Sequence, residues 1–114
     1  LILQAKHWYI DFVDQSEAEV KGKGIYGNVQ GIMHSLKHGL ATVMCVLALT
    51  GSEYFVFAFV IGFLDFVTHY HIDWIKSNAT RNLTANDRAF WIWLGFDQTL
   101  HYLTYIVFVA IMIS

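Results

Sequence analysis

The chain has 114 residues, of which 56% are hydrophobic, 17% aromatic and only 14% charged, and its mean hydropathy is +0.46. Soluble domains usually carry about 25% charged residues, so a water-soluble protein would have to hide a very large apolar surface, whereas a lipid bilayer covers such a surface directly. A net charge of −2 gives no reason to expect a nucleic-acid partner, and the single cysteine, Cys45, excludes an intrachain disulfide.

Four helices are predicted in one membrane-embedded domain that spans residues 1–114, in an all-α, antiparallel transmembrane bundle. Their expected ranges are about 1–15, 29–49, 53–76 and 87–113. The chain contains no proline that would interrupt a helix. The first helix is short for a membrane span, so we expect it to need residues before Leu1 to cross the bilayer fully.

Positive charge in the connections predicts an orientation. Lys21 and Lys23 lie in the polar connection 16–28, and Lys76, Arg81 and Arg88 flank the connection 77–86, whereas the turn at 50–52 has no Lys or Arg. The positive-inside rule therefore places connections 16–28 and 77–86 in the cytoplasm. Tryptophans at the same boundary fit an aromatic belt; they are Trp74, Trp91 and Trp93.

Pairs of His and Asp recur at a spacing of four residues, which places both side chains on one face of a helix, one turn apart. Five of the six histidines take part, whereas chance would give a partner to roughly one or two of six. The pairs are His7–Asp11, His34–His38, His69–Asp73 and Asp97–His101.

In an up-down bundle these pairs should converge. The first helix ends, the second begins, the third ends and the fourth begins at the same membrane face, so their polar residues share a depth of roughly 5–20 Å. We therefore expect the four pairs to meet in one cavity that faces the cytoplasm.

Imidazole and carboxylate groups are ligands for zinc, iron and manganese. We predict one or two divalent ions in the bundle core, zinc first, with manganese or iron as alternatives. A catalytic site would also need a carboxylate that accepts a proton from metal-bound water. Asp97 or Asp11 is the predicted base. Buried polar networks that tie helices together, or that handle protons, are the alternative reading. The candidate ligands are His7, Asp11, His34, His38, His69, Asp73, Asp97 and His101.

Four further residues are predicted to support the ligands from a second layer: Gln15, Asp65, Lys76 and Gln98. Asp65 lies one turn before His69 and could be a ligand itself. His71 is only two residues from His69, so it should point elsewhere.

The ordered set of motifs resembles the bacterial and phage integral membrane proteins of the DUF3307 family. The matching pieces are His7-x-x-x-Asp11-Phe12-x-x-Gln15, Lys23, His34-Ser35-Leu36-x-His38, His69-x-x-x-Asp73-x-x-Lys76 and Asp97-Gln98-x-x-His101. A more distant similarity connects the pattern to inner-membrane proteins described as metal-dependent hydrolases. The resemblance implies a bacterial inner-membrane or phage-encoded membrane protein and favours a metal site.

Three functions compete. The first is a membrane metallohydrolase that acts on an amphiphilic substrate from the cytoplasmic leaflet. The second is a non-enzymatic accessory or assembly protein whose polar core only fixes helix packing. The third, a metal or proton conduit, ranks last because the helices at 29–49 and 87–113 become almost wholly apolar beyond His38 and Tyr105. The sequence leaves open whether the chain forms a homo-oligomer or binds an assembly partner.

Overall fold

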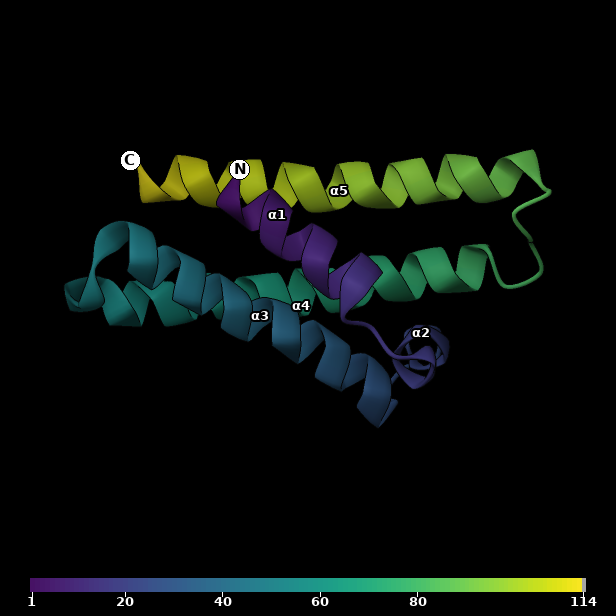
Figure 1. Ribbon diagram of the computed structural model, residues 1–114, viewed down its shortest axis with the longest axis horizontal. Coiled ribbons are helices and arrows are strands. Elements are labelled where there is room, and N and C mark those ends of the chain that lie inside the picture. The colour runs from purple at the N-terminus through teal and green to yellow at the C-terminus, as the bar shows by residue number, and fades with distance from the viewer. Residues whose placement is uncertain (114) are drawn as a thin grey trace.

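Helices account for most of residues 1–113, which are the residues that this computed structural model describes. They are α1 (Ile2–Trp8), α2 (Glu17–Gly22), α3 (Val29–Thr50), α4 (Phe55–Ala79) and α5 (Arg88–Met112). Each of the three long helices runs opposite to the next along the chain; α1 lies beside α3 and α5, and α2 lies at one end (Figure 1). The fold is the predicted all-α antiparallel bundle.

Three segments are long and apolar enough to cross a membrane: Val29–Thr50, Ser52–Ala79 and Arg88–Ile113. The long axis of the molecule measures 47 Å, which is close to the roughly 40–45 Å of a bilayer with its headgroup regions. Phe55, Phe59 and Phe63 on α4 each expose more than half of their surface. An exposed apolar surface of this kind indicates association with a membrane.

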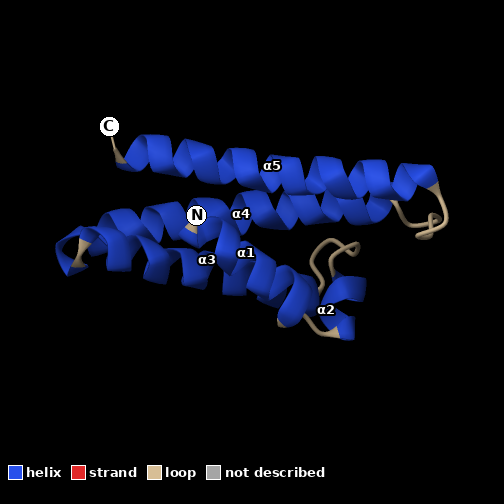
Figure 2. Cartoon of the chain, turned by 45° about the horizontal axis from the view of Figure 1, so that its top comes forward, coloured by secondary structure: helices blue, strands red, loops and turns tan. Residues whose placement is uncertain are grey.

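Burial in this protein is inverted relative to a soluble domain. Among the described residues, twelve buried side chains are polar or charged and only nine are hydrophobic. The apolar core, which includes Val46, Ala58 and Phe108, lies toward the α3–α4 turn. The opposite end of the molecule carries α2 and the α4–α5 connection and is called the loop end below (Figure 2). The buried polar residues come from the parts of the helices nearer this end.

The first segment differs from the regular helix expected over residues 1–15. After α1, residues Tyr9–Val13 form a wider π-helical turn, and the Asp14 amide donates to the Tyr9 carbonyl at 2.9 Å. The short helix α2 then begins at a capping box, in which Ser16 and Glu19 each bond the other's backbone amide. α2 was not predicted, although the pattern Ser16-Glu17-Ala18-Glu19 is a sequence signature of such a helix start.

Two glycines set the distance between α3 and α4. A Cβ added at Gly62 would lie 2.7 Å from the Gly39 carbonyl oxygen, and a Cβ at Gly39 would lie 2.8 Å from the Gly62 carbonyl oxygen. The two backbones therefore approach closely only because neither residue has a side chain. This crossing brings His38, which is adjacent to Gly39, toward the polar face of α4.

We predict that Gly62→Val lowers the free energy of unfolding by about 1–3 kcal/mol, the usual cost of overpacking a tight contact. Gly95→Val is the matched control, because a Cβ at Gly95 meets no atom within 4 Å and both substitutions place the same side chain inside a helix. Thermal unfolding in detergent measures the difference. Equal melting temperatures for the two variants would contradict this role of the α3–α4 crossing.

Candidate metal centre

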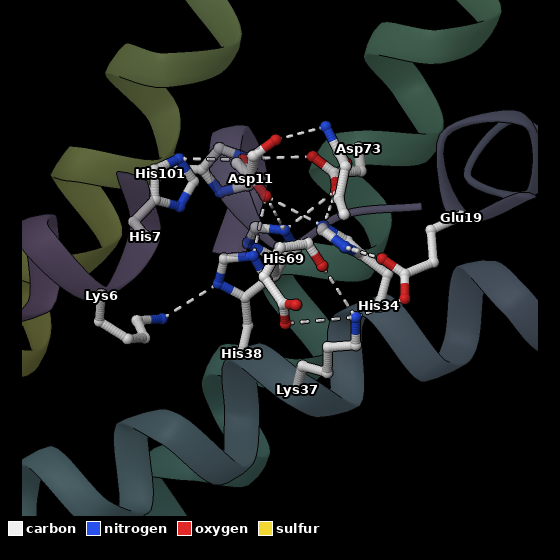
Figure 3. A network of polar contacts seen from close by, with 12 residues as sticks. Lys6, His7, Asp11, Glu19, His34, Lys37, His38, His69, Asp73 and His101 are labelled. Carbon is white, nitrogen blue, oxygen red and sulfur yellow. Dashed lines mark hydrogen bonds and ion pairs between the residues drawn. The ribbon is translucent and has the colours of Figure 1, made fainter. Parts of the chain in front are cut away.

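All eight predicted ligands lie together between the helices, and none exposes more than 5% of its surface. α1 and the π-helical turn after it, α3, α4 and α5 contribute one i,i+4 pair each, so residues almost a hundred positions apart in the chain become neighbours (Figure 3). The cluster consists of His7, Asp11, His34, His38, His69, Asp73, Asp97 and His101.

The Asp11 carboxylate lies at the centre of the cluster. Its Oδ1 atom is 2.9 Å from Nε2 of His34, 2.8 Å from Nε2 of His38 and 3.7 Å from Nε2 of His69, and its Oδ2 atom is 3.2 Å from Nε2 of His7. Zinc ligands at about 2.0–2.1 Å in tetrahedral geometry are roughly 3.3 Å apart. The spacing around Asp11 is therefore close to that of a ligand set.

Asp73 forms a second centre one layer away. Its Oδ2 atom lies 3.0 Å from Nε2 of His69 and 3.5 Å from Nε2 of His34, and its Oδ1 atom lies 3.1 Å from Nε2 of His101. The His69 ring stacks between the rings of His38 and His101, with centroid distances of 3.6 and 4.2 Å. His69 therefore belongs to the surroundings of both carboxylates.

Three overlapping groups of these side chains could hold a metal ion, since their ligand atoms lie within 4.8 Å of one another. His69 is a member of every group, whereas Asp97 is a member of none. The groups are Asp11, His34, His38 and His69; His7, His69 and His101; and Asp11, His69, Asp73 and His101.

Unsatisfied buried atoms test whether a cation fits. Both ring nitrogens of His69 and the Oδ2 atom of Asp73 are buried and form no hydrogen bond among the described residues, although His69 Nε2 and Asp73 Oδ2 lie only 3.0 Å apart. Leaving buried polar atoms unpaired is costly, and a divalent ion accepts lone pairs from imidazole nitrogen and carboxylate oxygen together. The donor set at His69 and Asp73 therefore fits a metal ion.

Glu19 orients one predicted ligand from outside the cluster. Its Oε2 atom lies 3.4 Å from Nδ1 of His34, and Lys37 holds Oε1 at 2.5 Å. Burial alone would raise the pKa of the Glu19 carboxyl, but hydrogen bonds from Lys37 and the Ser16 amide hold that pKa below its usual value. The charged carboxylate can accept the Nδ1 proton of His34. His34 Nε2 faces the Asp11 carboxylate at 2.9 Å and donates to it, so His34 would bind a metal through Nε2 only after that proton leaves, with Glu19 still orienting the ring.

His38 is held differently, because Lys6 Nζ lies 3.2 Å from its Nδ1 atom. An ammonium group only donates, so Nδ1 accepts and the ring proton lies on Nε2, facing Asp11. His7 has a similar pair of partners, with the Tyr105 hydroxyl 3.0 Å from Nδ1 and Gln98 Oε1 3.0 Å from Nε2. These two rings can bind a metal through Nε2 only after that proton leaves.

The four residues predicted to support the ligands lie around the cluster in different ways. Gln15 donates from its side chain to the Asp11 carbonyl, and Gln98 donates to Asp97 Oδ2 at 3.0 Å. Asp65 is outside the three groups, since it forms an ion pair with Lys6 at 3.0 Å and accepts a hydrogen bond from Thr42. Lys76 lines a cavity at the loop end.

His71 lies apart from the cluster. It is exposed, and its ring contacts the Tyr26 hydroxyl at 3.2 Å and the Val67 carbonyl at 2.8 Å. The structure thus separates two histidines that are only two positions apart, His69 and His71, because one helical residue advances the side-chain direction by about 100°. Residues that the spacing argument missed are Lys6, Glu19, Lys37 and Tyr105.

A small cavity of about 60 Å³ opens beside the cluster at the loop end, with Asp11, Asp73 and Asp97 among its lining residues. Lys23, the residue that follows α2, reaches it and lies 3.4 Å from Asp73 Oδ2 and 3.9 Å from Asp11 Oδ1. Burial alone would lower the pKa of the Lys23 ammonium, but the carboxylates of Asp73 and Asp11 raise that pKa above its ordinary value. Lys23 therefore stays charged at this opening.

Comparison with known proteins identifies a family. The model of a family described as "Protein of unknown function (DUF3307)" matches residues 1–114, which is the whole chain. No curated protein and no solved structure matches the chain.

We predict that purified protein binds a divalent metal and that His69→Ala removes most of it, since His69 is common to all three ligand groups. The same substitution at the exposed His71 is the control, because it changes an identical side chain on the same helix. Elemental analysis of detergent-purified protein gives the metal content, and added zinc should raise the melting temperature of the wild type but not of His69→Ala. Equal metal content in the two variants would count against the centre.

Proposed function

The chain belongs to the DUF3307 family, and we propose that it is an integral membrane protein, one membrane-embedded domain, that uses a metal centre to hydrolyse an amphiphilic substrate. The observation that carries the proposal is the set of overlapping ligand groups around His69 with one carboxylate, Asp97, outside them. A hydrolytic centre needs both parts, because the ligands hold the ion and a free base accepts a proton.

We propose that the divalent ion is zinc, with manganese or iron as alternatives. When bound, the ion would act as a Lewis acid and lower the pKa of a water molecule toward neutrality. The proposed ligands nearest to a ready geometry are His34 and His69, with Asp11 and Asp73. Glu19 orients His34, and the nitrogens of His69 form no hydrogen bond with another described residue, although Nε2 lies 3.0 Å from Asp73 Oδ2. His38 completes the first group, His7 and His101 complete the second, and His101 also completes the third.

Asp97 is the proposed general base. Its Oδ1 atom is buried without a hydrogen-bond partner among the described residues, and it lines the cavity at the loop end. Gln98 donates to its other oxygen at 3.0 Å and so fixes the direction of the carboxylate. His101 Nε2 lies 3.4 Å from Asp97 Oδ1 and 3.1 Å from Asp73 Oδ1, so it separates the proposed base from the ligand Asp73. Asp11 is the alternative base.

A purely structural role is the second candidate. Lys6 joins α1 to the rest of the bundle by an ion pair with Asp65 and contacts with His38 and Tyr105, all at 3.0–3.2 Å. These bonds tie helices together without any metal. They favour a non-enzymatic accessory protein if the cluster proves to bind no ion.

We predict that Asp97→Asn keeps the fold and the metal while hydrolytic turnover falls by roughly 10²–10⁴-fold, because the amide has the size of the carboxylate but cannot take a proton. Asp14→Asn, which removes the same charge from an exposed residue, should retain full turnover. The assay follows hydrolysis of phospholipid, lipid-linked sugar and peptide panels by metal-loaded protein. Loss of metal from Asp97→Asn would instead make Asp97 a ligand and move the base role to Asp11.

We also propose that the loop end faces the cytoplasm, which the lysines and arginines in and around connections 16–28 and 77–86 support. In a Cys45→Ala background, single cysteines at Lys21 and Arg81 should react with an impermeant thiol reagent only when the cytoplasmic side is open. A cysteine at Ser52, in the α3–α4 turn, should react from the other side; all three residues are exposed. Reaction of Ser52 and Arg81 variants from one side would refute the orientation.

A further inference from the structure

The cavity beside the metal centre has two lysines whose role the hydrolytic proposal does not use. Lys23 exposes only 12% of its side chain and directs its ammonium at Asp73 and Asp11. Lys76, one turn past Asp73 on α4, lines the same cavity and forms no ion pair with another described residue. Two ammonium groups at the opening of a buried carboxylate cluster indicate a site for an anion that also contacts the metal.

Charge decides which anion fits. The carboxylates of Asp11, Asp73 and Asp97 carry three negative charges, and Lys23 and Lys76 carry two positive ones. With neutral histidines the cavity is then negative by one charge, whereas one divalent ion makes it positive by one and two ions make it positive by three. The inference therefore rests on the proposed function, because without a metal these carboxylates would repel an anion.

Unpaired acceptor atoms at the same opening add a second requirement. Gln15 and Asp97 both line the cavity, and Gln15 Oε1 and Asp97 Oδ1 are buried and form no hydrogen bond among the described residues. They call for a ligand that carries its own O–H donor or an ordered water. A phosphate monoester meets both demands, since it offers anionic oxygens to the lysines and metal and, when singly protonated, a hydroxyl to these acceptors.

Two residues that line the cavity, Phe12 and Leu94, are apolar among otherwise polar ones, which points to a lipid as the source of the phosphate. Phe12, which exposes 57% of its surface, and Leu94 line the opening. Elsewhere on α5, Trp91 and Phe96 also expose at least half of their surface. An aromatic and aliphatic rim near a cationic opening matches a headgroup that enters while its chain stays in the membrane. We propose that the substrate is a membrane lipid with a terminal phosphate, held by Lys23 and Lys76.

Binding of dodecyl phosphate to the full, zinc-loaded chain in detergent tests this assignment. Lys23→Gln and Lys76→Gln should each weaken binding by about tenfold or more, the usual effect of removing a charged hydrogen-bond donor. Lys21→Gln is the control and should bind like the wild type, because Lys21 lies two residues from Lys23 but is exposed and paired with Glu17 at 3.5 Å. Zinc content and melting temperature of each variant are measured first, and variants that keep both are compared.

Each other outcome has a definite meaning. Inorganic phosphate should bind at least tenfold more weakly than dodecyl phosphate; equal affinity would overturn the lipid assignment in favour of a soluble phosphate. If the protein holds zinc but both lysine variants bind dodecyl phosphate as tightly as the wild type, the inference is overturned and the proposed function still stands. Wild-type protein that holds no zinc would overturn both.

Discussion

Three carboxylates and five imidazoles are buried between helices whose outer surface is apolar. The rest of the structure depends on this burial. Moving a carboxylate from water to a low-dielectric interior still costs several kcal/mol after relaxation, unless a cation compensates it. Lys23 supplies one charge to Asp73 and Asp11, which is fewer than the carboxylates present. A bound divalent ion would supply the remainder, and the close α3–α4 crossing and the capping box of α2 then hold its ligands in place.

The fold class and the meeting of the polar residues could both be predicted from the sequence. Four i,i+4 pairs and the alternation of charged and uncharged connections suffice, because an up-down bundle leaves little choice about which helix ends share a face. His69 and His71 show the resolving power of helical spacing, since one is fully buried in the cluster and the other is exposed. The i,i+4 spacing predicts Asp97 both as a ligand and as a base, and only its position in three dimensions separates it from the ligand groups.

The partners that orient the ligands could not be predicted in the same way. Lys6 contacts Asp65 and Tyr105, which are 59 and 99 positions away in the chain, and no local pattern encodes such pairs. Glu19 is different, because its capping-box motif predicts a helix start from the sequence. Its contact with His34, however, depends on how α2 packs against the start of α3. The π-helical turn at Tyr9–Val13 also has no sequence signature here, although it carries Asp11. Tertiary packing rather than propensity decides these features.

The central claim is that His69 and its carboxylate neighbours hold a metal ion in the membrane-embedded core. Anomalous X-ray diffraction from crystals of the zinc-loaded protein, measured on both sides of the zinc absorption edge, tests that claim most directly. The account predicts a strong peak between His69 and the Asp11 or Asp73 carboxylate, with zinc–nitrogen and zinc–oxygen distances of about 2.0–2.2 Å. Zinc peaks only at the protein surface, with His69 and Asp73 unligated, would contradict it.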